Sequence, residues 1–89
     1  MAIRHIAELV TKNSNTYADV AAFQAEHGPV GGNNANVQSV SFEVLASGNG
    51  VRRTCVFTDT TQMDAFFPQL ANDDASKTFS ATRTSLENI

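Results

Sequence analysis

The sequence predicts a single α+β domain over residues 1–89, in which a four-stranded antiparallel sheet carries two helices on one face. Apolar residues alternate with a period of two near both ends of the chain and in two stretches joined at Gly48-Asn49-Gly50. Helical spacing of apolar residues occurs once before and once after these two stretches. The resulting order, β-α-β-β-α-β, is the split βαβ arrangement of ferredoxin-like domains.

The first strand is expected from residue 3 to about residue 11. Both of its alternating sets mix apolar and polar residues, so we expect both faces to be covered. Asn15 is expected to cap a helix over residues 16–27, and Gly28-Pro29 to end it, because glycine tolerates the left-handed conformation and proline cannot continue a helix. The apolar side of this helix is expected to carry Tyr17, Val20, Ala21 and Phe23.

The two central strands are predicted to form a hairpin at Asn49-Gly50, which supports the positive φ angles of a type I′ turn. With this two-residue loop, Val44 lies opposite Cys55. Phe42 then lies opposite Phe57, and a four-residue loop would keep the same faces. One face of the hairpin is therefore apolar and is expected under the helices. The other face mixes aliphatic with hydroxyl and carboxylate side chains, and we expect a partner or a cavity there.

Asp59 is expected to cap a second helix over residues 61–70. A core-facing stripe with i, i+3, i+4, i+7 spacing is formed by Met63, Phe66, Phe67 and Leu70. Pro68 is expected to end or kink this helix, because its ring removes one N–H group and collides with the preceding turn. A polar connection at residues 72–74 then leads to a last strand over about residues 77–86.

Composition argues against several classes of partner. A net charge of −3 with only six Lys and Arg residues gives no basic stripe, so we expect no nucleic-acid binding. No apolar run approaches the ~20 residues that span a bilayer, and the first residues lack the regions of a signal peptide, so we expect no membrane association and a cytoplasmic location. Cys55 is the only cysteine, and it is expected to be a buried, unreactive thiol.

No motif for a metal or an organic cofactor is present, and we expect neither. His5 and His27 are 22 residues apart, which is not the spacing of a compact metal site. The glycines at residues 28–32 precede a strand, whereas a phosphate-binding glycine loop precedes a helix.

Four segments together carry a resemblance to a known family: Met1-Ala2-Ile3-Arg4-His5-Ile6, Val56-Phe57-Thr58-Asp59, the second helix and the closing strand. They resemble the dimeric α/β-barrel superfamily over nearly the whole chain. The antibiotic-biosynthesis monooxygenase-like branch is similar in layout and implies cofactor-free oxygen chemistry, although the pocket Trp of several of its members has no counterpart here. The stress-responsive A/B-barrel branch, which includes polyketide cyclases, is similar in placing a histidine on the first strand. It usually has a His-Pro-x-His-like stretch after its second helix, which this chain lacks.

His5 is the best candidate for catalysis, because a neutral imidazole can take a proton from a phenol or an acidic carbon. A histidine that is hydrogen-bonded within the sheet is the structural alternative. For His27, the end of a helix favours a structural role. The further candidates for lining a pocket are Tyr17, Glu43, Arg53 and Arg83. Glu8 and Glu43 would form a carboxylate pair if their strands brought them together.

Three functions of different classes fit these features. The first is a small, cofactor-independent, monooxygenase-like enzyme that acts on an aromatic or polyketide-like molecule. The second is a noncatalytic module that binds a small molecule, and the third is a dimeric interaction module. A homodimer is expected in each case, because Leu45 and Val56 on the uncovered sheet face would be a poor surface for a monomer.

Overall fold

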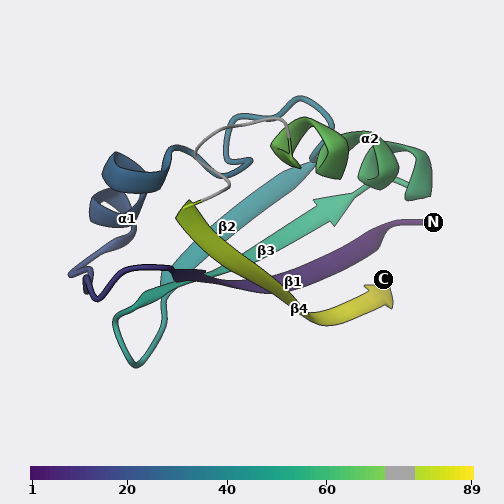
Figure 1. Cartoon of the computed structure of the whole chain (residues 1–89). Helices are drawn as coiled ribbons and strands as arrows, with labels where there is room; N and C mark the ends of the chain where they lie inside the picture. The colour runs from purple at the N-terminus through teal and green to yellow at the C-terminus, as the bar shows by residue number, and fades with distance from the viewer. Residues whose placement is uncertain (72–77) are drawn as a thin grey trace.

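The computed structural model describes residues 1–71 and 78–89 and has the predicted order of elements. The elements are β1 (Ile3–Thr11), α1 (Val20–His27), β2 (Ser39–Val44), β3 (Gly50–Phe57), α2 (Thr60–Ala71) and β4 (Phe79–Asn88). The four strands form one sheet in the order β2-β3-β1-β4, and each neighbouring pair is antiparallel. Both helices lie on the same side of this sheet, near opposite ends (Figure 1). The chain therefore has the predicted α+β ferredoxin-like arrangement. The predicted polar connection at residues 72–74 and the predicted start of the last strand at residue 77 lie outside the described residues.

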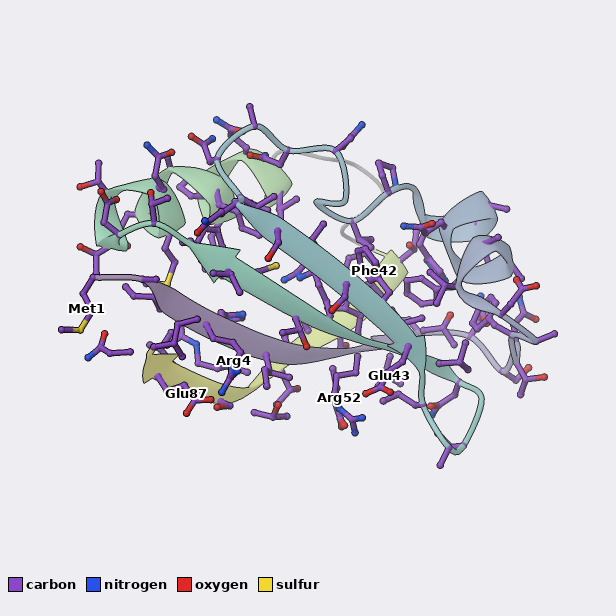
Figure 2. The ribbon with its side chains drawn as sticks, turned by 180° about the vertical axis from the view of Figure 1, so that it is seen from behind. Met1, Arg4, Phe42, Glu43, Arg52 and Glu87 are labelled. Atoms are coloured by element: carbon purple, nitrogen blue, oxygen red, sulfur yellow. The ribbon has the colours of Figure 1, made fainter. Side chains whose placement is uncertain are left out.

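The two faces of the sheet differ in how they are covered. Along β1, buried side chains alternate with half-buried ones from Ile3 to Thr11. The buried set faces the helices, as Phe42 does on β2, whereas Glu43 and Arg52 project from the opposite face (Figure 2). The prediction that β1 is covered on both faces therefore holds on one side only, because no described element covers the other.

Helix α1 begins later than predicted. Asp19 caps it, not Asn15, and the Asp19 carboxylate accepts a hydrogen bond of 2.8 Å from a first-turn backbone N–H. The segment before the cap is extended, because the backbone N–H of Tyr17 donates to the carbonyl of Gly48 in the hairpin turn at 2.8 Å. The end of the helix is as predicted: Gly28 has a φ of 84° and follows the last helical residue.

The hairpin keeps the predicted faces but has a different register. Val44 pairs with Val51, not with Cys55, and Phe42 pairs with Arg53. The shift is an even number of residues, so every side chain stays on its predicted face. Arg53 is therefore on the helix-covered face in either register, and the observed register places it next to Phe42.

Two glycines explain the register. The turn is made at Gly48, whose φ is 78° and whose N–H donates to the carbonyl of Leu45 at 2.8 Å. Gly50 is already part of β3, where a Cβ atom would lie 1.9 Å from the carbonyl oxygen of Leu9. Gly50 is therefore needed for the close approach of two backbones, and the predicted turn at Asn49-Gly50 is wrong.

Helix α2 continues through its proline. Asp59 caps it as predicted, and its carboxylate accepts a 3.0 Å hydrogen bond from the N–H of Gln62. Pro68 neither ends the helix nor prevents its last turn, which reaches Ala71. Of the two predicted effects of Pro68, the end of the helix is therefore wrong, and the kink stays a prediction. Phe66 before the proline and Leu70 after it pack in the same apolar cluster, and this packing offsets the lost backbone hydrogen bond.

The core consists of two apolar clusters. The α1 cluster contains Ala7, Leu9, Tyr17, Phe23, Val30, Val51 and Phe79. The α2 cluster contains Cys55, Phe57 and Phe66, with Val37, Val40, Met63, Phe67 and Leu70 packed against them. Cys55 is fully buried, which confirms its predicted position on the apolar face. Each helix thus covers its own part of the sheet.

Candidate functional site

A cavity of about 400 Å³ lies between the sheet and the helices. It is lined by His5, Ala7, His27, Val30, Arg53, Phe67, Leu70, Phe79, Ala81 and Arg83. Its apolar walls come from both clusters, because Val30 and Phe79 belong to the α1 cluster and Phe67 and Leu70 to the α2 cluster. The cavity is therefore the space left where the two clusters meet, and its polar side chains come from strands β1, β3 and β4 and from helix α1.

The sheet register places two arginines on either side of one alanine. Ala7 pairs with Arg53 on β3 and with Arg83 on β4. The three residues form a row across the sheet, on the face that the helices cover. Because the Ala7 side chain is a single methyl group, it leaves space between the two longer side chains.

His5 is buried beside this row and is neutral at physiological pH. His5 lies two residues before Ala7 on β1, so the two side chains are on the same face of the sheet. Only 3% of His5 is exposed. The ring packs 4.8 Å from the Phe67 ring, and its buried Nδ1 atom has no hydrogen-bond partner in the described part of the chain. Burial, then the charges of Arg83 and Arg53, lower the pKa of His5 from 6.5 to about 4. The imidazole can therefore accept a hydrogen bond or a proton from a bound molecule.

Arg53 is a buried cation without a carboxylate partner among residues 1–71 and 78–89. Its Nη1 atom donates to the carbonyl oxygen of Val30 at 2.9 Å, and its guanidinium carbon lies 5.4 Å from the centre of the Phe66 ring. Its Nε atom is buried and has no hydrogen-bond partner among the residues that the structure describes. Burial lowers the pKa of Arg53, but an arginine in a protein remains charged. One donor of the guanidinium is thus left unsatisfied.

The loop after α1 holds the Arg53 contact in place through unusual backbone conformations. Val30 has a φ of 47°, in the left-handed region that a β-branched residue rarely adopts. Gly31 follows with a φ of 91°, and a Cβ atom there would lie 2.5 Å from the Phe66 ring. Backbone strain of this kind costs about 1–3 kcal/mol and is found most often at functional sites.

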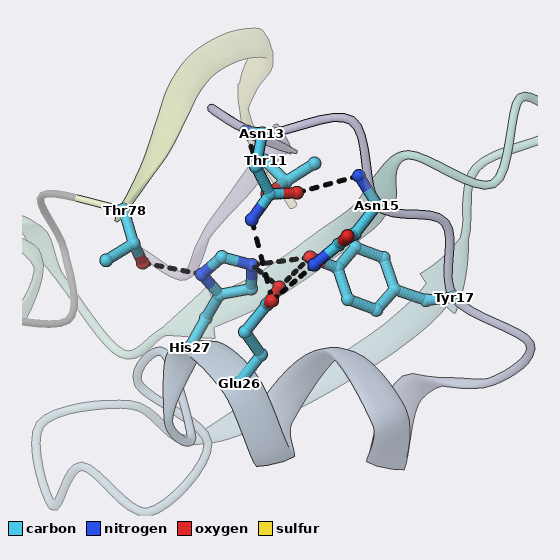
Figure 3. A network of polar contacts seen from close by, with 7 residues as sticks. All are labelled: Thr11, Asn13, Asn15, Tyr17, Glu26, His27 and Thr78. Atoms are coloured by element: carbon cyan, nitrogen blue, oxygen red, sulfur yellow. Dashed lines mark hydrogen bonds and ion pairs between the residues drawn. The ribbon is translucent and has the colours of Figure 1, made fainter.

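His27 borders the same cavity and is held by a polar network (Figure 3). Its Nδ1 atom lies 2.5 Å from the hydroxyl of Thr78, and its Nε2 atom lies 2.8 Å from the hydroxyl of Tyr17. The Tyr17 hydroxyl donates to the carboxylate of Glu26, which also accepts a 2.6 Å hydrogen bond from Asn15. Burial, then the hydrogen bond to Glu26, raise the pKa of Tyr17, and the same bond lowers the pKa of Glu26. The network fixes the ring of His27 at the cavity wall.

The predicted site residues fall into two groups. His5, Arg53 and Arg83 come together at the cavity. Tyr17 is buried behind His27 and is not among the lining residues of the cavity. Glu43 lies on the sheet face that no described element covers, which we call the open face (Figure 2). Its carboxylate is 2.6 Å from Arg52.

The predicted carboxylate pair is bridged by an arginine. Glu8 lies 3.5 Å from Arg52, which also contacts Glu43, so both carboxylates are used in an ion-pair network on the open face. Arg52 thus balances part of the charge of the two acids, and neither acid lines the cavity.

Sequence reasoning missed the place of His27 at the cavity. One signal could have found it: His27 follows the buried Phe23 by four residues, so the two side chains share one face of α1. The expected dipole effect at the helix end describes the backbone environment of His27 but not the direction of its side chain.

No three His, Cys, Asp or Glu side chains within residues 1–71 and 78–89 are grouped to hold a metal ion. None of the helices in this described part of the chain is long and apolar enough to span a bilayer. A comparison of the chain with protein-family models, curated proteins and solved structures found no match.

Proposed function

We propose that the cavity binds a small aromatic or polyketide-like molecule and that His5 accepts a proton from it. The observation that carries this proposal is the unpartnered Nδ1 atom of a buried, neutral His5 that lines the cavity. Cavities of a few hundred cubic ångströms with apolar walls and few polar groups are typical of small-molecule sites. Removal of a proton from a phenol or an acidic carbon leaves an electron-rich oxygen or carbon, which can react with dioxygen or close a ring.

The positive charges of Arg53 and Arg83 support this chemistry. An oxyanion that forms as the proton leaves is stabilised by cations and hydrogen-bond donors that are already in place. Both arginines line the cavity that His5 faces, and Ala7 between them leaves room for the reacting group. This reaction is the one that the resemblance to the dimeric α/β-barrel superfamily implies, and membership of that superfamily is part of the proposal.

The low pKa of His5 favours a second candidate, a binding module without catalysis. A base with a pKa of about 4 takes a proton weakly at neutral pH. In that role His5 accepts a hydrogen bond from the bound molecule and is not protonated by it. The two candidates share the cavity and differ only in whether turnover occurs.

Turnover of a panel of phenols, quinols and linear polyketide mimics by native protein and by His5→Gln separates these candidates. For an enzyme, we expect the variant to lose about 10²–10⁴-fold in rate, the usual effect of removing a positioned general base. Lys12→Gln, a change at an exposed residue outside the cavity, is the control and should keep the native rate. Equal turnover by native protein and His5→Gln would contradict the catalytic role. Binding of a panel member without turnover would favour the binding module.

We also propose that a second copy of this chain covers the open face of the sheet. The half-buried aliphatic side chains Ile6, Val10 and Val56 lie on that face and gain burial in a dimer. The cytoplasm stays the predicted compartment of this dimer.

Sedimentation at micromolar concentration tests the dimer. The native chain should sediment at twice its own mass, and Val56→Arg should sediment as a monomer because it places a charge in the interface. A native monomer would contradict the dimer but would leave the cavity and its chemistry unaffected, because every lining residue comes from one chain.

A further inference from the structure

We infer that the molecule bound in the cavity is an acid, whose carboxylate or similarly delocalised oxyanion lies between Arg53 and Arg83. This inference rests on the proposed function, because it names the chemical class of the molecule that the cavity holds. It is carried by the row of Arg53, Ala7 and Arg83 and by the composition of the described cavity wall, which contains two arginines and no carboxylate.

The buried guanidinium of Arg53 has no carboxylate partner within residues 1–71 and 78–89. A cation that leaves water loses much favourable solvation, and proteins normally return part of it with a paired anion. Here the backbone carbonyl of Val30, the ring of Phe66 and the side chain of Cys55 give partial compensation. The Nε donor has no partner within residues 1–71 and 78–89. An oxyanion bound in the cavity beside this guanidinium would supply the missing negative charge.

Arg83 is the second cation at the cavity wall. It lines the cavity from β4, and its charge acts on His5 together with that of Arg53. Two like charges on either side of Ala7 repel each other when the cavity is empty. An anion placed above Ala7 attracts both, so its binding replaces a repulsion with two attractions.

His5 and the apolar walls define the rest of the molecule. The free Nδ1 atom of His5 can accept a hydrogen bond from a hydroxyl group near the acid. Phe67, Leu70 and Phe79 offer an apolar surface to the remainder of the ligand. A volume of about 400 Å³ suits an aromatic or alicyclic acid of one or two rings.

The test uses a matched pair of probes, naphthalene-2-carboxylate and naphthalene-2-carboxamide, which have nearly the same shape and differ in charge. We expect native protein to bind the carboxylate about 10–100-fold more tightly by titration calorimetry, the range for hydrogen bonds to a charged group. Arg83→Gln should lose most of this preference. Arg83 is exposed on its strand, so the variant is expected to fold.

Two further variants serve as a control for the loss of a charge and as a test of whether the probes bind in the cavity. Arg52→Gln removes the same charge from the open face of β3, next to Arg53 in sequence, and should keep the native preference. Ala7→Leu fills the space between the two arginines and should abolish binding of both probes. Nuclear magnetic resonance spectra of each variant establish that the fold is retained.

Each outcome bears on a different part of the inference. Equal affinity for acid and amide, lost in Ala7→Leu, would overturn the acid class while the proposed binding function stands. A preference for the acid that is as strong in Arg83→Gln as in native protein would also overturn it. Binding unaffected by Ala7→Leu would place the probes outside the cavity and overturn the site. Failure of both probes to bind native protein would count against the inference and the proposed function together.

Discussion

The two faces of the sheet differ in whether their arginines are paired with carboxylates. On the open face, Arg4 lies 2.5 Å from Glu87, and Arg52 lies between Glu43 and Glu8, so each of these cations has an acidic neighbour. On the helix-covered face, Arg53 has no carboxylate partner in the described part of the chain.

Physical chemistry would favour the reverse arrangement if stability alone mattered. Exposed ion pairs contribute about 0–1 kcal/mol, whereas an unpaired buried charge is strongly unfavourable. Charges that are unpaired inside a cavity are characteristic of sites prepared for a ligand. The difference between the faces therefore supports a binding role for the covered face and a surface or contact role for the open one.

The largest expected contrast between the faces is in thiol reactivity. Cys55 is fully buried and burial raises the pKa of its thiol, so native protein should react with a thiol reagent about 10³-fold more slowly than unfolded protein. Thr54→Cys in a Cys55→Ala background moves the thiol to the open face, where labelling of protein diluted below the dimer concentration should be within about 10-fold of the unfolded rate. Rapid, complete labelling of native Cys55 would contradict its assignment to the covered face of the sheet.

A second contrast concerns neighbouring aliphatic residues of β1. Leu9 is fully buried under α1, whereas Val10 is half-buried on the open face. Leu9→Ala should lower the free energy of unfolding by about 2–5 kcal/mol in urea titrations, and Val10→Ala by less than about 1 kcal/mol. Equal losses in dilute protein would contradict the assignment of faces. A cost of Val10→Ala that grows with protein concentration would sharpen it, because burial of Val10 would then depend on the dimer.

The smallest contrast is a pH dependence that comes from the covered face. The pKa of His5 is about 4 in the folded chain and 6.5 in the reference state, so between these values the unfolded chain binds a proton that the folded chain does not. Stability due to neutral His5 is present above pH 6.5 and is lost as the pH falls toward 4, by no more than about 3 kcal/mol.

His5→Gln removes this titration while His27 remains, so the difference in unfolding free energy between native protein and variant isolates His5. We expect the variant to lose less stability than native protein between pH 7 and pH 4. A constant difference across this range would mean that His5 titrates normally, as an exposed histidine does.

Local features of the sequence predicted much of the fold. Asp59 and Gly28 marked helix ends through interactions within one turn, and the alternation in the two hairpin strands assigned their apolar face, where Cys55 is buried. A period of two is sufficient to assign faces, because successive side chains of a strand point in opposite directions. The sequence also drew attention to His5, Arg53 and Arg83, although it could not show that they lie together.

What the sequence by itself determined is therefore the order of elements, several of their ends and the two faces of the hairpin strands, all of which depend on neighbours along the chain. The tertiary structure decided the hairpin register, which followed the backbone contact between Gly50 and Leu9, and the later start of α1, which followed the contact between Tyr17 and Gly48. It also decided the site, because the row of Arg53, Ala7 and Arg83 depends on pairing between strands that are far apart in sequence. Alternation leaves such pairings open, since every shift by two residues keeps the same faces, and only long-range packing selects one of them.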